Sequence, residues 1–175
     1  EFSLALDIDK TALATVSANV DDLVLASSGS AFAISSDGYL ATNNHVIEGC
    51  QEVILHIGDR KILTTVITND QQNDLALIKA DFQPDWVFPL SKRGPGLLQD
   101  IYVAGYPVGM DLSRSVKVTK GIITSLSGIG NNHSELQIDA TLQNGNSGGP
   151  ILDDHGNVVG VAVAKLDMKF TLENF

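Results

Sequence analysis

Gly145-Asn146-Ser147-Gly148-Gly149-Pro150 is the stretch of sequence around which the rest of the chain is interpreted. Glycine lets the main chain adopt positive φ and approach another group without a Cβ clash. A serine among glycines can expose its hydroxyl together with main-chain amides, and each amide aimed at a developing negative charge contributes about 3 to 4 kcal/mol. The motif predicts a nucleophile, Ser147, beside an oxyanion hole within Gly145, Asn146 and Ser147, although such dipeptides also occur in ordinary hairpins.

Two further motifs supply the partners that a serine nucleophile needs. Thr42-Asn43-Asn44-His45-Val46-Ile47 places a histidine just past an alternating strand, and Asn73-Asp74-Leu75-Ala76-Leu77-Ile78 places a carboxylate at the start of an apolar strand. A serine hydroxyl is a weak nucleophile until a base removes its proton, and the base needs a carboxylate that fixes its tautomer. The chain therefore offers one candidate for each role, in the order His45, Asp74, Ser147.

Taken together, the three motifs resemble those of trypsin-like serine proteases, specifically the HtrA/Deg branch, over roughly residues 25 to 164. The resemblance implies an all-β fold of two antiparallel six-stranded β-barrels of the trypsin/chymotrypsin type, with the active site in the cleft between them. It implies a single protease domain over residues 1–175. The N-terminal barrel at 1–90 would carry the histidine and the aspartate, 91–96 would be the crossover, and the C-terminal barrel at 97–175 would carry the serine.

The function implied by the resemblance is a serine endopeptidase that acts on unfolded or extended polypeptides through an acyl-enzyme intermediate. The alternative is a catalytically silent pseudoenzyme that keeps the cleft as a peptide-binding or regulatory module, against which the intact triad argues. A serine esterase of the α/β-hydrolase kind needs the order Ser, Asp, His and a helix after the nucleophile. This chain has the opposite order and a strand-like sequence after Ser147.

The resemblance also places a substrate pocket near Ser147. Its base would be Thr141 with Leu142 beside it, and its far wall would be formed by Val161, Ala162, Val163 and Ala164. Since Thr141 is no carboxylate, a buried Lys or Arg side chain would lack a partner there, at a cost of several kcal/mol. We therefore expect a preference for small or medium aliphatic residues at P1, the substrate residue that donates the scissile carbonyl.

The chain departs from the family pattern at three points. Asn144 stands where HtrA/Deg proteins usually carry a proline, so the oxyanion loop loses a rigidifying residue. Asn146 stands where trypsin-like zymogens carry the aspartate that pairs with a new N-terminus, so we expect no activation by N-terminal cleavage. The PDZ domains common in the family do not fit into Leu166 to Phe175, so either they were trimmed or this member is regulated otherwise.

Composition limits the classes of partner. With 175 residues and 43% hydrophobic content, the chain can hold one ordinary domain or two small fused barrels. A net charge of −10 argues against nucleic acid and anionic membrane surfaces as partners. No apolar run of about 18 residues predicts a membrane span. The expected partner is a polypeptide substrate, and the family analogy adds a homo-oligomer, a trimer.

The expected location is extracytoplasmic, either the bacterial periplasm or the secreted fraction, or organellar, as a mature or trimmed chain. The single Cys50 can form no disulfide within the chain. A nucleophilic pair of Cys50 and His45 is disfavoured, because Ser147 lies in the better-built turn.

The other histidines lie at structural or solvated positions: His56, His133 and His155. Asp153 and Asp154 with Asp139 could suggest a metal site, but an acidic turn that contains glycine is far more often a turn without a metal. No metal and no cofactor are expected.

Short runs rich in Val, Ile, Thr or Phe, bounded by turn residues, predict strands in both halves of the chain. In the first half these strands are expected at 30–35, 39–42, 52–57, 61–68 and 75–79, and in the second at 101–104, 116–123, 136–140, 150–152 and 158–165. The first 25 residues are ambiguous because helical spacing is interrupted by polar residues. A short helix or an irregular arm is expected there.

Overall fold

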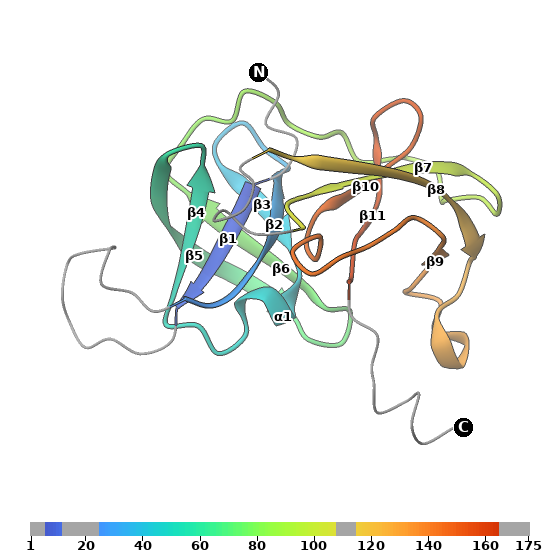
Figure 1. Ribbon diagram of the computed structural model, residues 1–175, viewed down its shortest axis with the longest axis horizontal. Coiled ribbons are helices and arrows are strands. Elements are labelled where there is room, and N and C mark those ends of the chain that lie inside the picture. The colour runs from blue at the N-terminus through green and yellow to red at the C-terminus, as the bar shows by residue number, and fades with distance from the viewer. Residues whose placement is uncertain (1–5, 12–24, 108–114, 165–175) are drawn as a thin grey trace.

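The computed structural model describes residues 6–11, 25–107 and 115–164. Two halves built of β-strands lie side by side (Figure 1). The first half is a closed barrel of antiparallel strands in the order β1-β2-β3-β6-β5-β4. Its elements are β1 (Leu6–Thr11), β2 (Leu25–Ala33), β3 (Tyr39–Thr42), the single helical turn α1 (Asn44–Ile47), β4 (Glu52–Ile57), β5 (Arg60–Asp70) and β6 (Leu75–Ala80).

The second half is a sheet of five antiparallel strands in the order β11-β10-β7-β8-β9. Its elements are β7 (Asp100–Gly105), β8 (Lys117–Ser125), the 3-10 turn η2 (Ile129–Asn131), β9 (Gln137–Ile138), β10 (Pro150–Leu152) and β11 (Val158–Val161). The all-β class with two trypsin-like halves is confirmed. Within the described residues the first half has the six expected strands and the second has five, and β11 ends at Val161 rather than at 165.

The N-terminal arm differs from the expectation. Leu6–Thr11 is a strand that pairs with both β2 and β4 and closes the first barrel, so the expected helix or irregular arm is wrong for these residues. The helical spacing that argued for it lies at residues 12–24, outside the described residues. The remaining sequence signal was the alternation of Leu6 and Ile8 with Asp7 and Asp9, which has the period of a strand.

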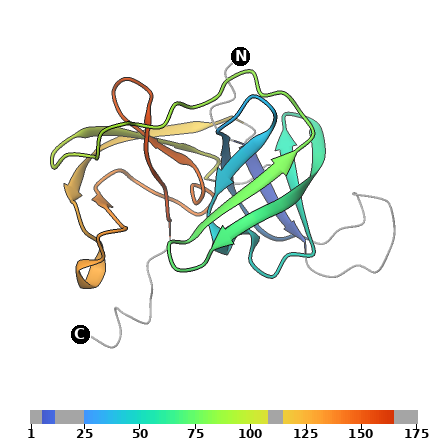
Figure 2. The ribbon, with the colours of Figure 1, turned by 180° about the vertical axis from the view of Figure 1, so that it is seen from behind.

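Alternation along the strands explains how each half fills its interior. On β6 the buried residues are Ala76, Ile78 and Ala80, separated by partly exposed ones, and β3 contributes Leu40 to the same interior. Figure 2 shows β5 and β6 side by side on the rear face of this barrel. The second half has its own core, which is built from Ile101, Val103, Ile123, Ala140, Ile151 and Ala162.

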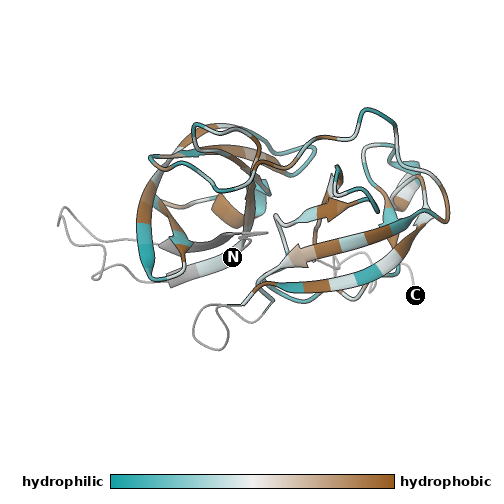
Figure 3. Cartoon of the chain, turned by 90° about the horizontal axis from the view of Figure 1, so that it is seen from above, coloured by the Kyte–Doolittle hydropathy of each residue, from teal (hydrophilic) through white to brown (hydrophobic). Residues whose placement is uncertain are grey.

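A third apolar cluster joins the halves, which Figure 3 shows next to one another from above. Phe32 of β2 meets Phe88 of the connecting segment edge to face, at 6.0 Å between ring centroids. Leu152 and Val158 of the second sheet complete the cluster. The connecting segment also pairs with β11, since the Ser91 amide donates to the Val158 carbonyl at 2.9 Å. The two halves are therefore docked through a shared core.

The helical segments of the described residues are short, and none has the length and apolar character needed to cross a membrane.

Candidate active site

His45 lies on α1, the single helical turn that follows β3. The register of β3 against β6 pairs Thr42 with Ala76, so the end of β3 lies beside the beginning of β6. Asp74 directly precedes β6. The expected neighbours in the first barrel, His45 and Asp74, are therefore brought together by the pairing of two strands.

The Asp74 carboxylate holds His45 at two points. Its Oδ2 lies 2.6 Å from His45 Nδ1, and its Oδ1 accepts a hydrogen bond from the His45 amide at 2.8 Å. Because a carboxylate accepts, Nδ1 of the neutral ring carries the proton and Nε2 is left as the basic nitrogen. This is the tautomer that a general base for serine requires.

Asp74 has an uncommon backbone conformation, with φ at 52°. The left-handed region is unfavourable for residues other than glycine, although aspartate and asparagine tolerate it best. The fully buried Asn43 stabilises it, because its side-chain Nδ2 donates to the Asp74 carbonyl at 2.8 Å. Next to it, Asn44 Oδ1 accepts from Asn69 Nδ2 at 2.6 Å. The two asparagines before the histidine thus hold the segment that carries the carboxylate.

Ser147 lies in the buried glycine turn between β9 and β10. Gly145 and Gly148 take positive φ of 96° and 85°. A Cβ on Gly148 would collide with the Ser30 carbonyl and the Thr42 hydroxyl, so the turn packs against the ends of β2 and β3. His45 follows Thr42 by three positions along the chain. The structure therefore brings Ser147 of the second half to the part of the first barrel that carries the histidine.

The hydroxyl and amides of this turn differ in their partners. Ser147 Oγ accepts a hydrogen bond from the Ala164 amide at 3.1 Å. The Asn146 amide donates to Gln143, the Gly148 amide to Ala162 and the Gly149 amide to Asn146. Among the hydrogen bonds of the described residues, the amides of Gly145 and Ser147 donate none.

The Asn146 side chain is part of the interior and not of the oxyanion hole. The residue is 4% exposed, and its Oδ1 lies 2.8 Å from the position that a Cβ on Gly105 would take. Within the described residues this oxygen has no hydrogen-bond partner.

The expected pocket residues differ in their exposure and contacts. Ala162 is 1% exposed and belongs to the core of the second half, and Leu142 packs on the same core. Thr141 is exposed, and its carbonyl accepts from the Thr119 hydroxyl at 3.1 Å. Of the far wall, Val163 is exposed, and Ala164 reaches the nucleophile through its amide.

Val161 lines a different space, an apolar cavity of about 510 Å³ between the two halves. This cavity does not include Thr141. Its walls come from both halves and include Phe32, Ile34, Leu75, Leu77, Leu90, Val159 and Val161.

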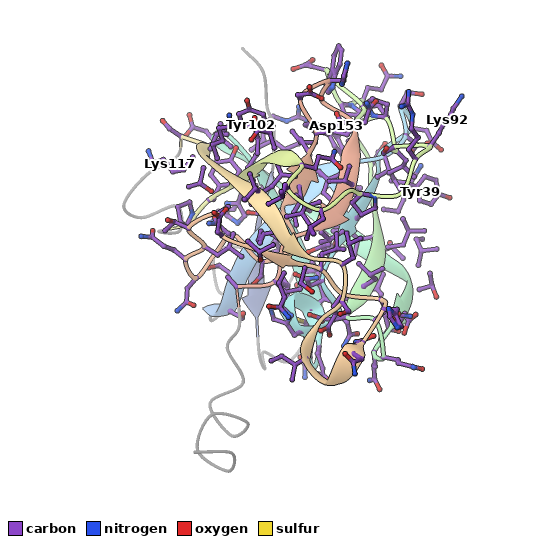
Figure 4. All side chains as sticks on the ribbon, turned by 90° about the vertical axis from the view of Figure 1, so that its right-hand side faces the viewer. Tyr39, Lys92, Tyr102, Lys117 and Asp153 are labelled. Carbon is purple, nitrogen blue, oxygen red and sulfur yellow. The ribbon has the colours of Figure 1, made fainter. Side chains whose placement is uncertain are left out.

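The other candidate groups have structural surroundings. Cys50 packs against the core of the first barrel. Asp153 lies in the turn between β10 and β11 (Figure 4), where its Oδ1 accepts from the amides of His155 and Asn157. Asp153, Asp154 and His155 could converge on a cation, but the last two are exposed. Asp139 takes no part in that cluster and accepts from the Ile122 amide at 2.6 Å.

Two residues at the site had no role in the sequence analysis beyond their place in a motif. Asn43 is one, and the two consecutive asparagines before His45 were the available sequence signal. Ser30 is the other. Its amide donates to the Ser147 carbonyl at 2.7 Å, and its hydroxyl donates to the Gly145 carbonyl at 2.7 Å. Nothing in the run from Gly29 to Ile34 indicates these contacts.

The two antiparallel β-sheet halves have the fold of a trypsin-like peptidase. The family of trypsin-like peptidase domains matches residues 29–161, and the chain belongs to this family. A serine endoprotease from Yersinia pestis has a similar structure, with a TM-score of 0.71 and 28% identity over 90% of this chain and 52% of that one.

The curated relatives point to the branch within this family. A probable periplasmic serine endoprotease, DegP-like, from Hahella chejuensis is 36% identical over 77% of this chain and 29% of its own length. The uncharacterized protein y4bJ of Sinorhizobium fredii is 37% identical over 81% of this chain and 22% of its own length. The resemblance to the HtrA/Deg type is thereby confirmed. The chain spans less than a third of the length of these relatives.

Proposed function

We propose that this chain is the catalytic part of a serine endopeptidase that hydrolyses peptide bonds of unfolded or extended polypeptides. The observation that carries the proposal is the 2.6 Å contact between His45 Nδ1 and Asp74 Oδ2. Membership in a peptidase family supports the reaction class. Ser147 is the nucleophile, His45 is the general base and then the general acid, and Asp74 is the orienting carboxylate.

In this mechanism the Ser147 hydroxyl attacks the scissile carbonyl while His45 Nε2 takes its proton. The carbonyl oxygen becomes an oxyanion, to which the amides of Gly145 and Ser147 donate. The imidazolium gives its proton to the departing amine as the C–N bond breaks, which leaves an acyl group on Ser147. A water molecule that His45 deprotonates then attacks the ester, and the serine recovers its proton from the imidazolium as the second product leaves.

The resting geometry at Ser147 supports this direction of proton transfer. The Ala164 amide already donates to Ser147 Oγ at 3.1 Å. This contact uses Ser147 Oγ as an acceptor and leaves the hydroxyl proton available for donation. A neutral His45 Nε2 is the acceptor that the mechanism requires.

The specificity that we propose is for small or medium aliphatic P1 residues, because Thr141 offers no negative charge to a basic side chain. A peptide library should show cleavage after Val, Ala, Ile or Leu and little after Lys or Arg. Dominant cleavage after basic residues would mean that the specificity pocket has another base.

The names of the relatives bear on location. DegP-like relatives are named as periplasmic endoproteases, and we propose an extracytoplasmic location for this protein as well. Assembly into a homo-trimer is proposed by analogy with the HtrA/Deg type alone.

The deciding experiment is labelling with a fluorophosphonate probe, which reacts only with an assembled Ser-His pair. The unaltered protein should be labelled at Ser147, and Ser147→Ala should be neither labelled nor active on a casein-type substrate. Its fold should be unchanged, since one hydroxyl is removed from a turn. Residual activity above about 10% in Ser147→Ala would overturn the assignment. Peptide binding without labelling in the unaltered protein would instead identify a silent, peptide-binding relative.

A further inference from the structure

Ser30, a buried serine of the first barrel, donates two hydrogen bonds to the serine turn of the second half. It is 0% exposed. Its amide donates to the Ser147 carbonyl and its hydroxyl to the Gly145 carbonyl, each at 2.7 Å. Its own carbonyl accepts from Thr42 Oγ1 at 2.8 Å, and its Oγ accepts from the Tyr106 amide at 3.1 Å.

These contacts fix two peptide planes of the turn. The Gly145–Asn146 peptide is held at its oxygen by the Ser30 hydroxyl and at its nitrogen by the Gln143 carbonyl. The Ser147–Gly148 peptide is held at its oxygen by the Ser30 amide and at its nitrogen by the Ala162 carbonyl. Since each peptide is planar, both orientations are determined.

The two amides proposed for the oxyanion hole belong to the other two peptides of the same turn. The Ser147 amide belongs to the peptide between the two fixed planes, and the Gly145 amide belongs to the peptide that precedes the first one. Within the described residues neither amide donates a hydrogen bond. The Ser147 amide therefore lies between two peptides that Ser30 holds, and the Gly145 amide lies in the peptide next to the first of them.

The Tyr106 amide gives the Ser30 hydroxyl its direction. A hydroxyl has one proton and can accept as well as donate. Because the Tyr106 amide donates to Ser30 Oγ, the single hydroxyl proton is left for the Gly145 carbonyl. The turn thus depends on a side chain that belongs to the other half of the molecule.

We propose that Ser30 is a positioning residue that forms the oxyanion hole before substrate binds. The proposal rests on the proposed function, and it assigns to a first-barrel serine the control of amides in the second half. The oxyanion exists only after attack, so loss of this control lowers kcat and leaves KM nearly unchanged. Since a displacement of about 1 Å can cost about 100-fold, we expect kcat of Ser30→Ala to fall about 10- to 100-fold.

The matched control is Thr64→Ala. Thr64 is also buried in the first barrel, and its hydroxyl donates to the Val53 carbonyl at 2.8 Å. Both variants lose one buried hydrogen bond from a hydroxyl to a carbonyl, and Ser30→Ala also removes the acceptor of the Tyr106 amide. We expect a larger shift of the urea midpoint in Ser30→Ala than in Thr64→Ala, and kcat within about twofold of the unaltered protein in Thr64→Ala only.

Two measurements separate positioning from mere stability. A peptidyl boronic acid forms a tetrahedral adduct with the serine and fills the oxyanion hole, so its inhibition constant should weaken in Ser30→Ala by about the same factor as kcat. Ser30→Cys keeps the volume and a weak donor, and its kcat should lie between those of Ser30→Ala and the unaltered protein. This second variant also decides the question if Ser30→Ala does not fold.

Hydrogen exchange of a peptide that covers residues 143–149 provides a readout that needs no activity. It should be faster in Ser30→Ala and in Ser30→Cys, and unchanged in Thr64→Ala. If the unaltered protein is not labelled by fluorophosphonate, the proposed function fails while this exchange still tests the positioning. Unchanged exchange in both Ser30 variants, or an equal loss of kcat in Ser30→Ala and Thr64→Ala, would overturn the proposal.

Discussion

The two parts of the candidate site are held in different ways. The His45–Asp74 pair is held within one barrel, by the Asp74 carboxylate and by the side chain of Asn43. The Ser147 turn is held mainly by main-chain groups, and Ser30 of the first barrel donates two hydrogen bonds to it. The first part therefore depends on local pairing of β3 with β6. The second part depends on how the two halves are docked.

The largest expected effect tests the first part. Asp74→Asn keeps the shape of the side chain, but an amide has one accepting oxygen and cannot accept from both the main-chain amide and Nδ1 of His45 as the two carboxylate oxygens do. The histidine is then expected to adopt the wrong tautomer. We expect kcat to fall about 10⁴-fold, equivalent to about 5.5 kcal/mol, in a peptide assay. Asp59→Asn, in an exposed turn, should stay within about twofold. A decrease of less than about tenfold in Asp74→Asn would mean that the carboxylate does not orient the base.

Docking of the halves is tested next by Phe88→Ala. Phe88 is 5% exposed in the cluster that joins them, so we expect a loss of about 3 to 5 kcal/mol in the free energy of unfolding by urea. Phe82 packs against the core of the first barrel, and Phe82→Ala is the control. Below the unfolding transition, fluorophosphonate labelling should slow in Phe88→Ala and not in Phe82→Ala. Equal labelling rates would contradict the dependence of the serine turn on docking.

Asn43→Ala tests how the first part is held. It leaves the Asp74 carbonyl without its 2.8 Å donor in a partly buried place, so we expect a loss of about 1 kcal/mol in stability and about tenfold in kcat. Asn69→Ala removes the donor to Asn44 Oδ1, a bond that is also partly buried, so it should cost a similar amount of stability but leave kcat within about twofold. Equal effects of the two variants on kcat would show that the Asp74 backbone needs no support from Asn43.

The smallest expected effect lies outside the site, in the turn between β10 and β11. Burial alone would raise the pKa of Asp153, but hydrogen bonds from Asn157 and from the His155 amide outweigh it and hold the pKa below its ordinary value. A carboxyl whose pKa is lower in the folded chain stabilises the fold above its unfolded pKa, about 3.9, and this contribution is lost as the pH falls through the folded pKa.

Asp153→Ala should therefore cost about 1 kcal/mol near neutral pH, with a smaller difference from the unaltered protein at a pH of about 3. Urea unfolding at both pH values measures this. The control is Asp154→Ala, since Asp154 is exposed and pairs only with an exposed histidine and should contribute less than about 0.5 kcal/mol. A pH-independent difference for Asp153→Ala would contradict the assigned cause.

Much of the fold could be predicted from sequence, because short alternating strands and turn residues are local signals. The triad residues were named for the same reason, since each stands in a motif beside a strand end. The closing strand β1 was missed because its alternation is brief and a longer helical spacing follows it. The substrate pocket around Thr141 stays a prediction, and the burial of Ala162 in the core of its own sheet was not predicted. The role of Ser30 leaves no local signal, since its partner Gly145 is 115 residues away.

That separation has a consequence for the order in which the protein folds. Contacts between residues far apart in sequence form slowly, because the loop between them must first be closed. The helical turn that carries His45 has four residues and is too short to persist alone. We therefore expect a partly folded chain to lack a reactive serine. In a refolding experiment, we expect fluorophosphonate reactivity to emerge only in the slowest phase, after fluorescence of Trp86 has reached most of its final value.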